Sequence, residues 1–342
     1  MHAVLLKGYG GFEQLEYRDD VPIPVPRAGE VLVRIGAAGV NNTDINTRTG
    51  WYARDAQPAG SGWTGAAFQF PRIQGADACG RIVATGPDVD AARLHERVLI
   101  EPLFRVRGPD GALRPVYFGS ECDGAFADYA RVPAAHAFRI DTPLADEELA
   151  SFPCAYSAAE NMLTRADLRA GETVLVTGAS GGVGSAAVQL ARRRGAAVIA
   201  VAGASKAAAV AAAGADRVLA RGTDLRLDPG FESVDVVVDV VGGAQFGAAL
   251  DVLKRFGRYA VAGAIDGPSV GLDLRTLYLK DLRLLGCTVL EAGVFANLVR
   301  YIERGEVRPL VAAVHPLRAI VHAQQEFLAR RHTGKIVLKP AG

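Results

Sequence analysis

The stretch 172-ETVLVTGASGGVGSAAVQLARRRGAAVIAVAG-203 decides the fold class. An apolar run at 173–177 leads into a glycine-rich turn, a helical pattern follows as far as Arg194, and a second apolar run occupies 197–201. Strand, turn, helix and second strand in this order are typical of a unit that binds a dinucleotide. The stretch therefore predicts an α/β fold in which parallel strands alternate with helices.

Further apolar runs continue this alternation at 217–220, 234–241, 257–263 and 282–290. They are continuously apolar, as expected of parallel strands that helices bury on both faces. Six such strands with intervening helices predict a Rossmann doubly wound parallel sheet. The first ~130 residues differ, because their short apolar runs are broken by Gly and Pro, which predicts a mostly β domain.

The length of 342 residues exceeds the size at which a single hydrophobic core keeps growing, so two domains are expected. After a helical pattern near 294–304, the chain returns to β-like runs. We therefore expect a mostly β domain made of residues 1–132 and 305–342, and a dinucleotide-binding domain made of residues 133–304.

Charge and cysteine usage exclude several classes of protein. The chain has 38 basic and 37 acidic residues, a net charge of +1, which favours neither a nucleic-acid nor a membrane surface. Its N-terminal apolar run is far too short for a signal peptide or a membrane span. The four cysteines show no CxxC spacing, so we expect reduced thiols in a cytoplasmic protein.

The turn ASGGVG at 179–184 predicts a phosphate cradle. Small residues let the backbone turn sharply and approach a pyrophosphate, and the first amides of the following helix bind that anion. The expected contacts come from Ser180, Gly181, Gly182, Val183 and Gly184. The alternative is a tight strand-to-helix turn without a ligand.

The end of the second strand predicts which dinucleotide binds. A site for NAD usually places Asp or Glu there, to accept hydrogen bonds from the ribose 2′-hydroxyl. Here the strand runs into Ala202 and Gly203, followed by Ser205 and Lys206. An ammonium and a hydroxyl attract a 2′-phosphate, so NADPH is the expected cofactor, although Lys206 could instead be a solvated residue at a helix start.

The chain resembles the medium-chain dehydrogenase/reductase superfamily over nearly all of its length. The matching segments are GEVLVRIGAAGVNNTD (29–44), FPRIQGADACGRIVATGPDV (70–89), HERVLIEP (95–102), DGAFADYARVP (123–133), ETVLVTGASGGVG (172–184), AGADRVL (213–219), VDVVVDVVG (234–242), GRYAVAG (257–263) and HTGKIVL (332–338). The resemblance implies a GroES-like catalytic domain, a Rossmann domain and hydride transfer in the cleft between them.

The resemblance also indicates which residues stand at the positions of catalytic zinc ligands. Zinc-dependent members place a Cys where this chain has Asn41, and a His-Glu pair where it has Ala76 and Asp77, while a third ligand position falls at Cys154. A catalytic zinc needs three protein ligands, so Asp77 and Cys154 leave the site one short. We therefore expect no metal, and we place the chain in the zinc-independent quinone oxidoreductase and enoyl reductase-like branch. The alternative is a substitute ligand from elsewhere in the chain, such as His95, which would be an unusual arrangement.

In zinc-free relatives a conjugated carbonyl accepts hydride, and the protein must stabilise the enolate oxygen and deliver a proton. The segment 40-VNNTDINTRTGWYAR-54 resembles the part of those reductases that carries a catalytic tyrosine. The implied catalytic residues are Tyr52, as hydrogen-bond or proton donor, and Asn41, as an active-site amide. The alternatives are an aromatic that packs with Trp51 and a buried turn amide, and Asp44 and Arg48 could form an ion pair.

The resemblance implies further cofactor contacts. They are expected from Val241 and Gly242 after the fourth strand, from Gly263 and Ala264 after the fifth, and from Lys335, which could also be a surface lysine. The aromatic residues of the segment 50–71, among them Trp63, Phe68 and Phe70, suggest an apolar or aromatic substrate, unless they only anchor that segment. A homodimer is expected through the edge strand at 282–290.

The leading hypothesis is an NADPH-dependent, zinc-independent oxidoreductase that reduces conjugated C=C bonds or quinones. The alternative enzyme is an NADP(H)-dependent alcohol dehydrogenase or carbonyl reductase with a non-standard zinc site. A protein that binds NADPH without turnover is the alternative from another class.

Overall fold

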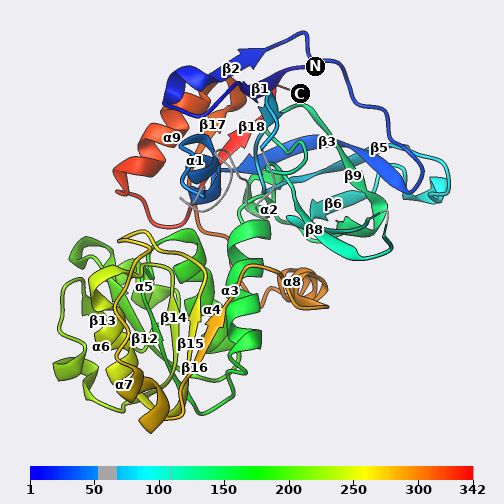
Figure 1. Ribbon diagram of the computed structural model, residues 1–342. Helices are drawn as coiled ribbons and strands as arrows, with labels where there is room; N and C mark the ends of the chain where they lie inside the picture. Colours follow the sequence, from blue (N-terminus) through cyan, green and yellow to red (C-terminus); the bar gives the residue numbers. More distant parts are fainter. Residues whose placement is uncertain (53–67, 109, 342) are drawn as a thin grey trace. The chain divides into compact units, whose positions relative to one another are not determined.

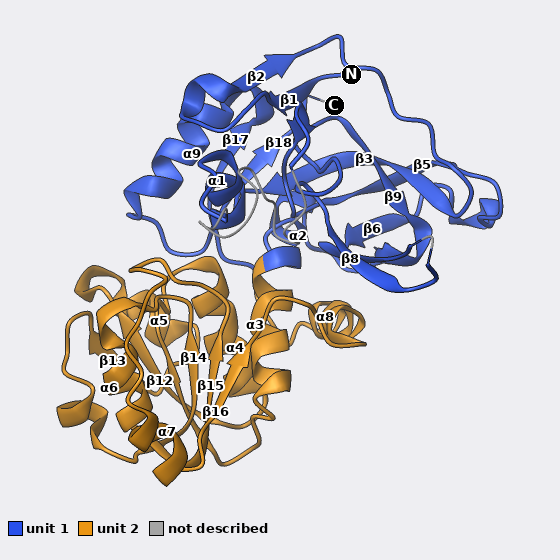
Figure 2. Ribbon diagram, viewed as in Figure 1, with its two compact units in different colours: residues 1–154, 309–342 blue, residues 155–308 orange. Residues whose placement is uncertain are grey.

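The computed structural model describes residues 1–52, 68–108 and 110–341 (Figure 1). The chain divides into a unit 1 of residues 1–154 and 309–342 and a unit 2 of residues 155–308 (Figure 2). These boundaries differ from the expected 132/133 and 304/305. Residues 133–154 belong to unit 1 because β10 (Ala137–Arg139) pairs with β6 (Arg97–Ile100), and Arg308 belongs to unit 2 because its carbonyl accepts a hydrogen bond from Tyr156.

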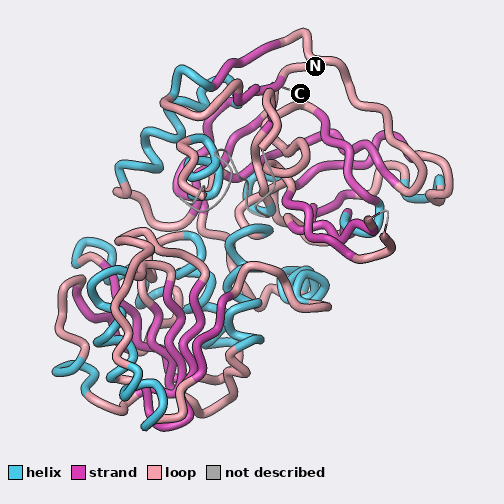
Figure 3. The backbone as a smooth tube through the Cα atoms, in the orientation of Figure 1, coloured by secondary structure: helices cyan, strands magenta, loops and turns pink. Residues whose placement is uncertain are grey.

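Unit 2 contains a six-stranded parallel sheet in the order β13-β12-β11-β14-β15-β16. Figure 3 shows its strands side by side in magenta. The strands are β11 (Thr173–Val176), β12 (Ala197–Ala202), β13 (Arg217–Ala220), β14 (Val234–Asp239), β15 (Leu253–Val261) and β16 (Arg283–Gly286). Counted along the unit, this is the order 3-2-1-4-5-6 of a doubly wound sheet. The predicted Rossmann fold is confirmed.

Helices cover the sheet of unit 2 (Figure 1). The apolar side chains of its central strands are buried. The helices are α3 (Pro153–Arg165, whose first two residues belong to unit 1), α4 (Gly182–Arg193), α5 (Ala207–Ala212), α6 (Phe246–Asp251), α7 (Leu274–Leu279) and α8 (Val294–Glu303). The strand β16 is shorter than its apolar run and forms one edge of the sheet, as expected.

Unit 1 is mostly β, as predicted. Its largest sheet runs β10-β6-β5-β3-β18-β17, with β9 also paired to β3, and smaller sheets run β2-β1-β4 and β7-β8. The strands not yet given are β1 (Ala3–Leu6), β2 (Leu15–Arg18), β3 (Glu30–Gly39), β4 (Arg72–Ile73), β5 (Cys79–Thr85), β7 (Leu103–Arg107), β8 (Leu113–Tyr117), β9 (Tyr129–Pro133), β17 (Val311–Pro316) and β18 (Lys335–Lys339). The last two strands confirm that the C-terminus returns to the first domain.

Among the described residues, the α-helices that belong wholly to unit 1 are α1 (Asn42–Arg48), α2 (Asp146–Leu149) and α9 (Ile320–Ala329). The strand β3 lies between β5 and β18 and pairs with both in antiparallel register. Three separate segments of the chain therefore meet around the last residues of β3. They are the segment that contains β5, the segment that contains β18, and the end of β3 with the start of α1. Within the described residues, no helix has both the length and the apolar character that crossing a membrane requires.

Candidate functional site

The glycine-rich turn of unit 2 joins β11 to α4. Gly178 has a φ of +58°, in the left-handed region, and Gly181 caps the first turn of α4. A Cβ on Gly184 would lie 2.2 Å from the carbonyl oxygen of Gly178, so that position accepts only glycine. The first N–H groups of a helix have no partner within it, and together with the helix dipole they bind an anion. The turn therefore has the geometry of the predicted phosphate cradle.

The strand β12 ends beside this turn without a carboxylate. After Ala202, Gly203 precedes a short 3-10 helix of residues Ala204–Lys206, where Ser205 is exposed and Lys206 is half-buried. The neighbouring strand β13 adds a second cation, because Arg221 follows it directly and donates its backbone N–H to the carbonyl of Ala202 at 2.9 Å. Sequence reasoning missed Arg221, although its position after an apolar run was visible.

A buried carboxylate, Asp239, organises the carboxyl end of β14. It accepts hydrogen bonds from the hydroxyl of Thr177 at 2.5 Å and from the N–H of Val241 at 2.7 Å, and it also bonds the hydroxyl of Tyr259. Burial first, and then the charge of Asp239, raise the pKa of Tyr259. This network ties the loop after β14 to strands β11 and β15, and sequence reasoning did not predict it.

The two loops expected to approach the nicotinamide ribose lie against each other. Gly242 has a φ of +64°, and a Cβ placed on it would lie 3.3 Å from the Cα of Ala264. A Cβ on Gly263 would lie 2.8 Å from the carbonyl oxygen of Val240. The structure thus brings together Val241, Gly242, Gly263 and Ala264, and their contact with a cofactor stays a prediction.

In unit 1 a buried ammonium, carboxylate and amide form a cluster, which we call the Lys335 cluster: Lys335, Asp77 and Asn41. The Nζ of Lys335 lies 2.7 Å from Oδ2 of Asp77, and Lys335 also donates to Oδ1 of Asn41. The Nδ2 of Asn41 donates to the same Oδ2 of Asp77 at 2.9 Å. The exposed fractions of Lys335, Asp77 and Asn41 are 3%, 0% and 7%. The cluster is therefore a buried set of charge-assisted hydrogen bonds in a low-dielectric setting.

The register of the sheet explains this convergence. Ala37 of β3 pairs with Cys79, and Val337 of β18 pairs with Gly39. Continued by two residues, these antiparallel registers bring Asp77 level with Gly39 and Lys335 level with Asn41, on the two sides of β3. A Cβ on Gly39 would lie 2.5 Å from Oδ2 of Asp77, so a glycine is needed for the carboxylate to fit. Lys335 is thus not a surface residue.

Helix α1 fixes the amide of Asn41 without using it as a cap. The carboxylate of Asp44 accepts the backbone N–H of Asn41 at 2.7 Å, so the Asn41 side chain remains available for the cluster. Burial raises the pKa of Asp44 to about 7, against the hydrogen bond from Asn41 and the charge of Lys335. The ion pair suggested between Asp44 and Arg48 is not formed. Arg48 instead donates to the carbonyl of Gly10 at 2.8 Å and to Gln324.

Tyr52 lies four residues after the end of α1 and is half-buried. Its hydroxyl is 3.3 Å from Oγ1 of Thr43 and 3.4 Å from Nδ2 of Asn46, both on α1. Its ring also packs edge-on against Trp51, at 5.4 Å between centroids, as the packing alternative expected. The packing of Tyr52 on Trp51 is therefore observed, and its role as a donor stays a prediction.

The aromatic residues of the segment 50–71 have partners in unit 1. The ring of Phe70 lies 4.8 Å from that of Tyr9 and meets it edge-on, and Phe68 packs against both rings. These contacts favour the interpretation that the aromatic side chains anchor the segment 50–71 to unit 1. Trp63, which was expected to shape the pocket, lies outside the described residues.

The residues at the expected zinc-ligand positions do not fit a metal ion. Both oxygens of Asp77 are already bound, Oδ2 by Lys335 and Asn41 and Oδ1 by the backbone N–H of Cys154 at 2.5 Å. Burial, and then the charge of Asp77, raise the pKa of the Cys154 thiol, whereas a metal binds the thiolate. A metal ion bound to Oδ2 of Asp77 would have to displace the ammonium of Lys335, which lies 2.7 Å from that oxygen. In the described part of the chain, His95 joins no group of three potential ligands.

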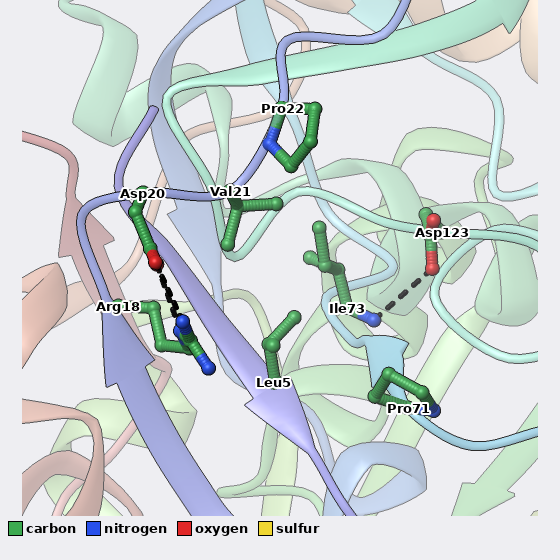
Figure 4. Close-up of a pocket in the computed structure, with 8 residues that line it drawn as sticks. All are labelled: Leu5, Arg18, Asp20, Val21, Pro22, Pro71, Ile73 and Asp123. Carbon is green, nitrogen blue, oxygen red and sulfur yellow. Dashed lines mark hydrogen bonds and ion pairs between the residues drawn. The ribbon is translucent and has the colours of Figure 1, made fainter.

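A hollow of about 310 Å³ opens elsewhere on unit 1, near β1, β2 and β4 (Figure 4). Leu5, Val21, Pro22 and Pro71 line it, and Arg18 and Asp20 form an ion pair of 2.6 Å at its edge. The hollow contains none of the expected site residues, and we assign it no chemistry.

Comparison with known proteins agrees with the two units. Residues 27–142 match the model of the alcohol dehydrogenase GroES-like domain, and residues 182–304 match that of a zinc-binding dehydrogenase. Acryloyl-coenzyme A reductase of Metallosphaera sedula is 30% identical over 99% of both chains. Quinone oxidoreductase of Lama guanicoe is 28% identical over 99% of this chain and 97% of its own. The chain belongs to the medium-chain dehydrogenase/reductase superfamily, as its motifs predicted.

Solved structures show the same fold. The crystal structure of a putative alcohol dehydrogenase from Sinorhizobium meliloti 1021 has a TM-score of 0.93 and 49% identity, with 99% of this chain and 96% of that chain covered. A 2-octenoyl-CoA carboxylase reductase in complex with NADP and 2-octenoyl-CoA has a TM-score of 0.87 and 25% identity, over 99% of this chain and 87% of that chain.

Proposed function

We propose that this protein is an NADPH-dependent, zinc-independent oxidoreductase that reduces a C=C bond conjugated to a carbonyl group, or a quinone. The observation that carries the proposal is the Lys335 cluster, in which a buried ammonium contacts Asn41 and Asp77, the positions to which the resemblance assigns zinc ligands. The names of the relatives support it, because acryloyl-coenzyme A, quinones and 2-octenoyl-CoA are all conjugated acceptors.

The choice of NADPH rests on unit 2. The cradle binds the pyrophosphate through the first amides of α4, and the end of β12 offers the 2′-phosphate a hydroxyl and a cation in Ser205 and Lys206. Arg221 adds a second positive charge next to Ala202. An Asp or Glu at this place would repel the 2′-phosphate. The bound NADP of the 2-octenoyl-CoA carboxylase reductase supports the same choice.

Bound NADPH supplies the hydride, which adds to the β-carbon of the acceptor and leaves negative charge on the carbonyl oxygen. We propose that Lys335 stabilises this charge. An ammonium has three N–H donors, and Asp77 and Asn41 take two of them in the described part of the chain. In this proposal the third donates to an oxygen of the substrate. Asp77 and Asn41 act as positioning residues, since they fix the direction in which Lys335 donates.

The α-carbon then needs a proton, and Tyr52 is our candidate donor. A phenol has a single donor on a rigid ring, and its ordinary pKa near 10 is suited to protonating an enolate. The hydroxyl groups of Tyr52 and Thr43 are 3.3 Å apart, so the phenol is held on the helix that begins after Asn41. Helix α1 therefore contacts Tyr52, the proposed proton donor. The residue before this helix, Asn41, contacts Lys335, the proposed cation.

A second candidate function, alcohol or carbonyl oxidoreduction, is favoured by the putative alcohol dehydrogenase at 49% identity. Assays with NADPH against an enal, an enoyl thioester, a naphthoquinone and a simple aldehyde, each with and without a chelator, separate the two. We expect reduction of the conjugated acceptors at a rate that the chelator does not change. Alcohol oxidation that a chelator abolishes would contradict the proposal and support the alternative.

We further propose a homodimer that forms through β16. This strand is the edge of the parallel sheet, and Leu284 is 39% exposed on it, so its unpaired backbone groups and apolar side chain would be covered by a second copy. Light scattering should give twice the 35.9 kDa of one chain, and a mass of one chain would contradict the dimer.

A further inference from the structure

Two histidines and a glutamate converge in unit 1, and none of the three belongs to the Lys335 cluster. His315 is on β17, and His322 and Glu326 are on α9. Residues four apart lie on the same face of a helix, so His322 and Glu326 point in the same direction. One potential ligand atom from each of the three residues lies within 4.8 Å of the others.

The three side chains are already held near one another. Nε2 of His315 lies 2.8 Å from Oε2 of Glu326, although 11 positions separate them in the sequence. The rings of His315 and His322 have centroids 5.1 Å apart and stand at 87° to each other. Around a tetrahedral zinc, ligand atoms about 2.0–2.1 Å from the ion are roughly 3.4 Å apart, so small side-chain rotations close the site.

The donor set selects the kind of ion. Two imidazoles and one carboxylate suit zinc and its transition-metal neighbours, whereas calcium and magnesium prefer oxygen ligands alone. The site is accessible, because His322 is exposed and the side chains of His315 and Glu326 are 19% and 35% exposed. Water can complete the coordination at the fourth position.

We propose that His315, His322 and Glu326 form a binding site for a divalent transition-metal ion of the zinc class, separate from the Lys335 cluster. The ion joins β17 to α9 and so adds a cross-link within unit 1. Because β17 pairs with β18, which begins at Lys335, the cross-link braces the segment that carries the buried ammonium. The protein thus binds zinc through a site that takes no part in hydride transfer.

The test uses the full chain, freed of metal and titrated with Zn²⁺ by calorimetry and with Co²⁺ by absorption spectroscopy. The variants are His322→Ala and Glu326→Gln at the proposed site, with Cys154→Ser as the matched control at the position of a zinc ligand in relatives. Ala is a good helix former, so His322→Ala should fold, and far-ultraviolet circular dichroism verifies this.

We expect one ion per chain with a Kd below about 100 μM, at least tenfold weaker binding in His322→Ala and Glu326→Gln, and unchanged binding in Cys154→Ser. Zn²⁺ should raise the Tm of the wild type and of Cys154→Ser, but not of His322→Ala. NADPH-dependent activity of His322→Ala should match the wild type. Weaker affinity in the wild type, equal binding by His322→Ala, or loss of binding in Cys154→Ser would each overturn the proposal.

Discussion

The cradle of unit 2 and the Lys335 cluster of unit 1 are built in opposite ways. The cradle is made mainly of backbone groups from one continuous segment, between Gly178 and Lys206. The cluster is made of side chains, and the hydrogen bond between Lys335 and Asn41 spans 294 positions. A site made of consecutive backbone groups is visible in a motif, whereas a site made of distant side chains depends on the register of a sheet. Five variants test this contrast.

The largest expected effect is that of Asp77→Ala. It leaves the buried ammonium of Lys335 without its counter-charge, and breaking a buried pair in this way costs about 3–5 kcal/mol of stability. Urea unfolding measures the change. Asp20→Ala, which removes an exposed partner of Arg18, is the control and should cost far less, because solvent screens an exposed pair. Equal losses in the two variants would mean that the Lys335 cluster contributes no more than a surface ion pair.

Asp44→Asn tests the second buried carboxyl group of this region. The pKa of Asp44 is raised from 3.8 to about 7, so the folded state holds this proton more tightly than the unfolded state does. The stability that this proton gives the folded state is complete below about pH 4 and is lost as the pH rises through 7. An amide does not ionise. We therefore expect the variant to exceed the wild type by a few kcal/mol above about pH 7, and the two stabilities to converge near about pH 4. A gap that does not change with pH would contradict the raised pKa.

Tyr52→Phe separates proton donation from packing. If the phenol protonates the enolate, turnover should fall by about a hundredfold or more, while the affinity for NADPH stays the same. The control is Tyr17→Phe, which removes the hydroxyl of a tyrosine that is 37% exposed. Unchanged turnover in Tyr52→Phe would leave this residue with only its contact to Trp51.

Gly184→Ala tests whether the cradle depends on the close approach of its backbone. Its Cβ would meet the carbonyl oxygen of Gly178 at 2.2 Å, and such overpacking costs about 1–3 kcal/mol. At Gly181 the nearest atom to an added Cβ is 3.5 Å away, so Gly181→Ala is the matched control and should keep its stability. Thermal unfolding compares the two variants. A stable Gly184→Ala would show that the turn tolerates a wider geometry.

The smallest expected effect concerns the choice of cofactor. Lys206→Ala should raise the Michaelis constant for NADPH about tenfold and that for NADH much less, because only the 2′-phosphate is bound by the ammonium. Lys254→Ala is the control, since Lys254 pairs with Asp235 near the start of β14, at the other end of the sheet. Equal changes for both coenzymes would refute the assignment of Lys206.

The sequence predicted the residues of the Lys335 cluster separately but not as a group. Asn41 and Asp77 were identified as positions where zinc-dependent relatives bind their metal, and Lys335 as a cofactor contact, while the structure joins the three by hydrogen bonds. The network around Asp239 was not predicted, because a buried acid at the end of a strand resembles any strand terminus until Thr177 and Tyr259 lie beside it.

By itself, the sequence determined the α/β class, the superfamily, the glycine turn and the absence of an acid at the end of β12. Each of these features depends on residues that are close together in the sequence and whose backbone conformation is set locally. Only the tertiary structure decided the partner of Lys335, the isolation of Asp44 from Arg48, and the meeting of His315 with Glu326. Those contacts follow from strand register and burial, which a chain acquires only when its distant segments pack together.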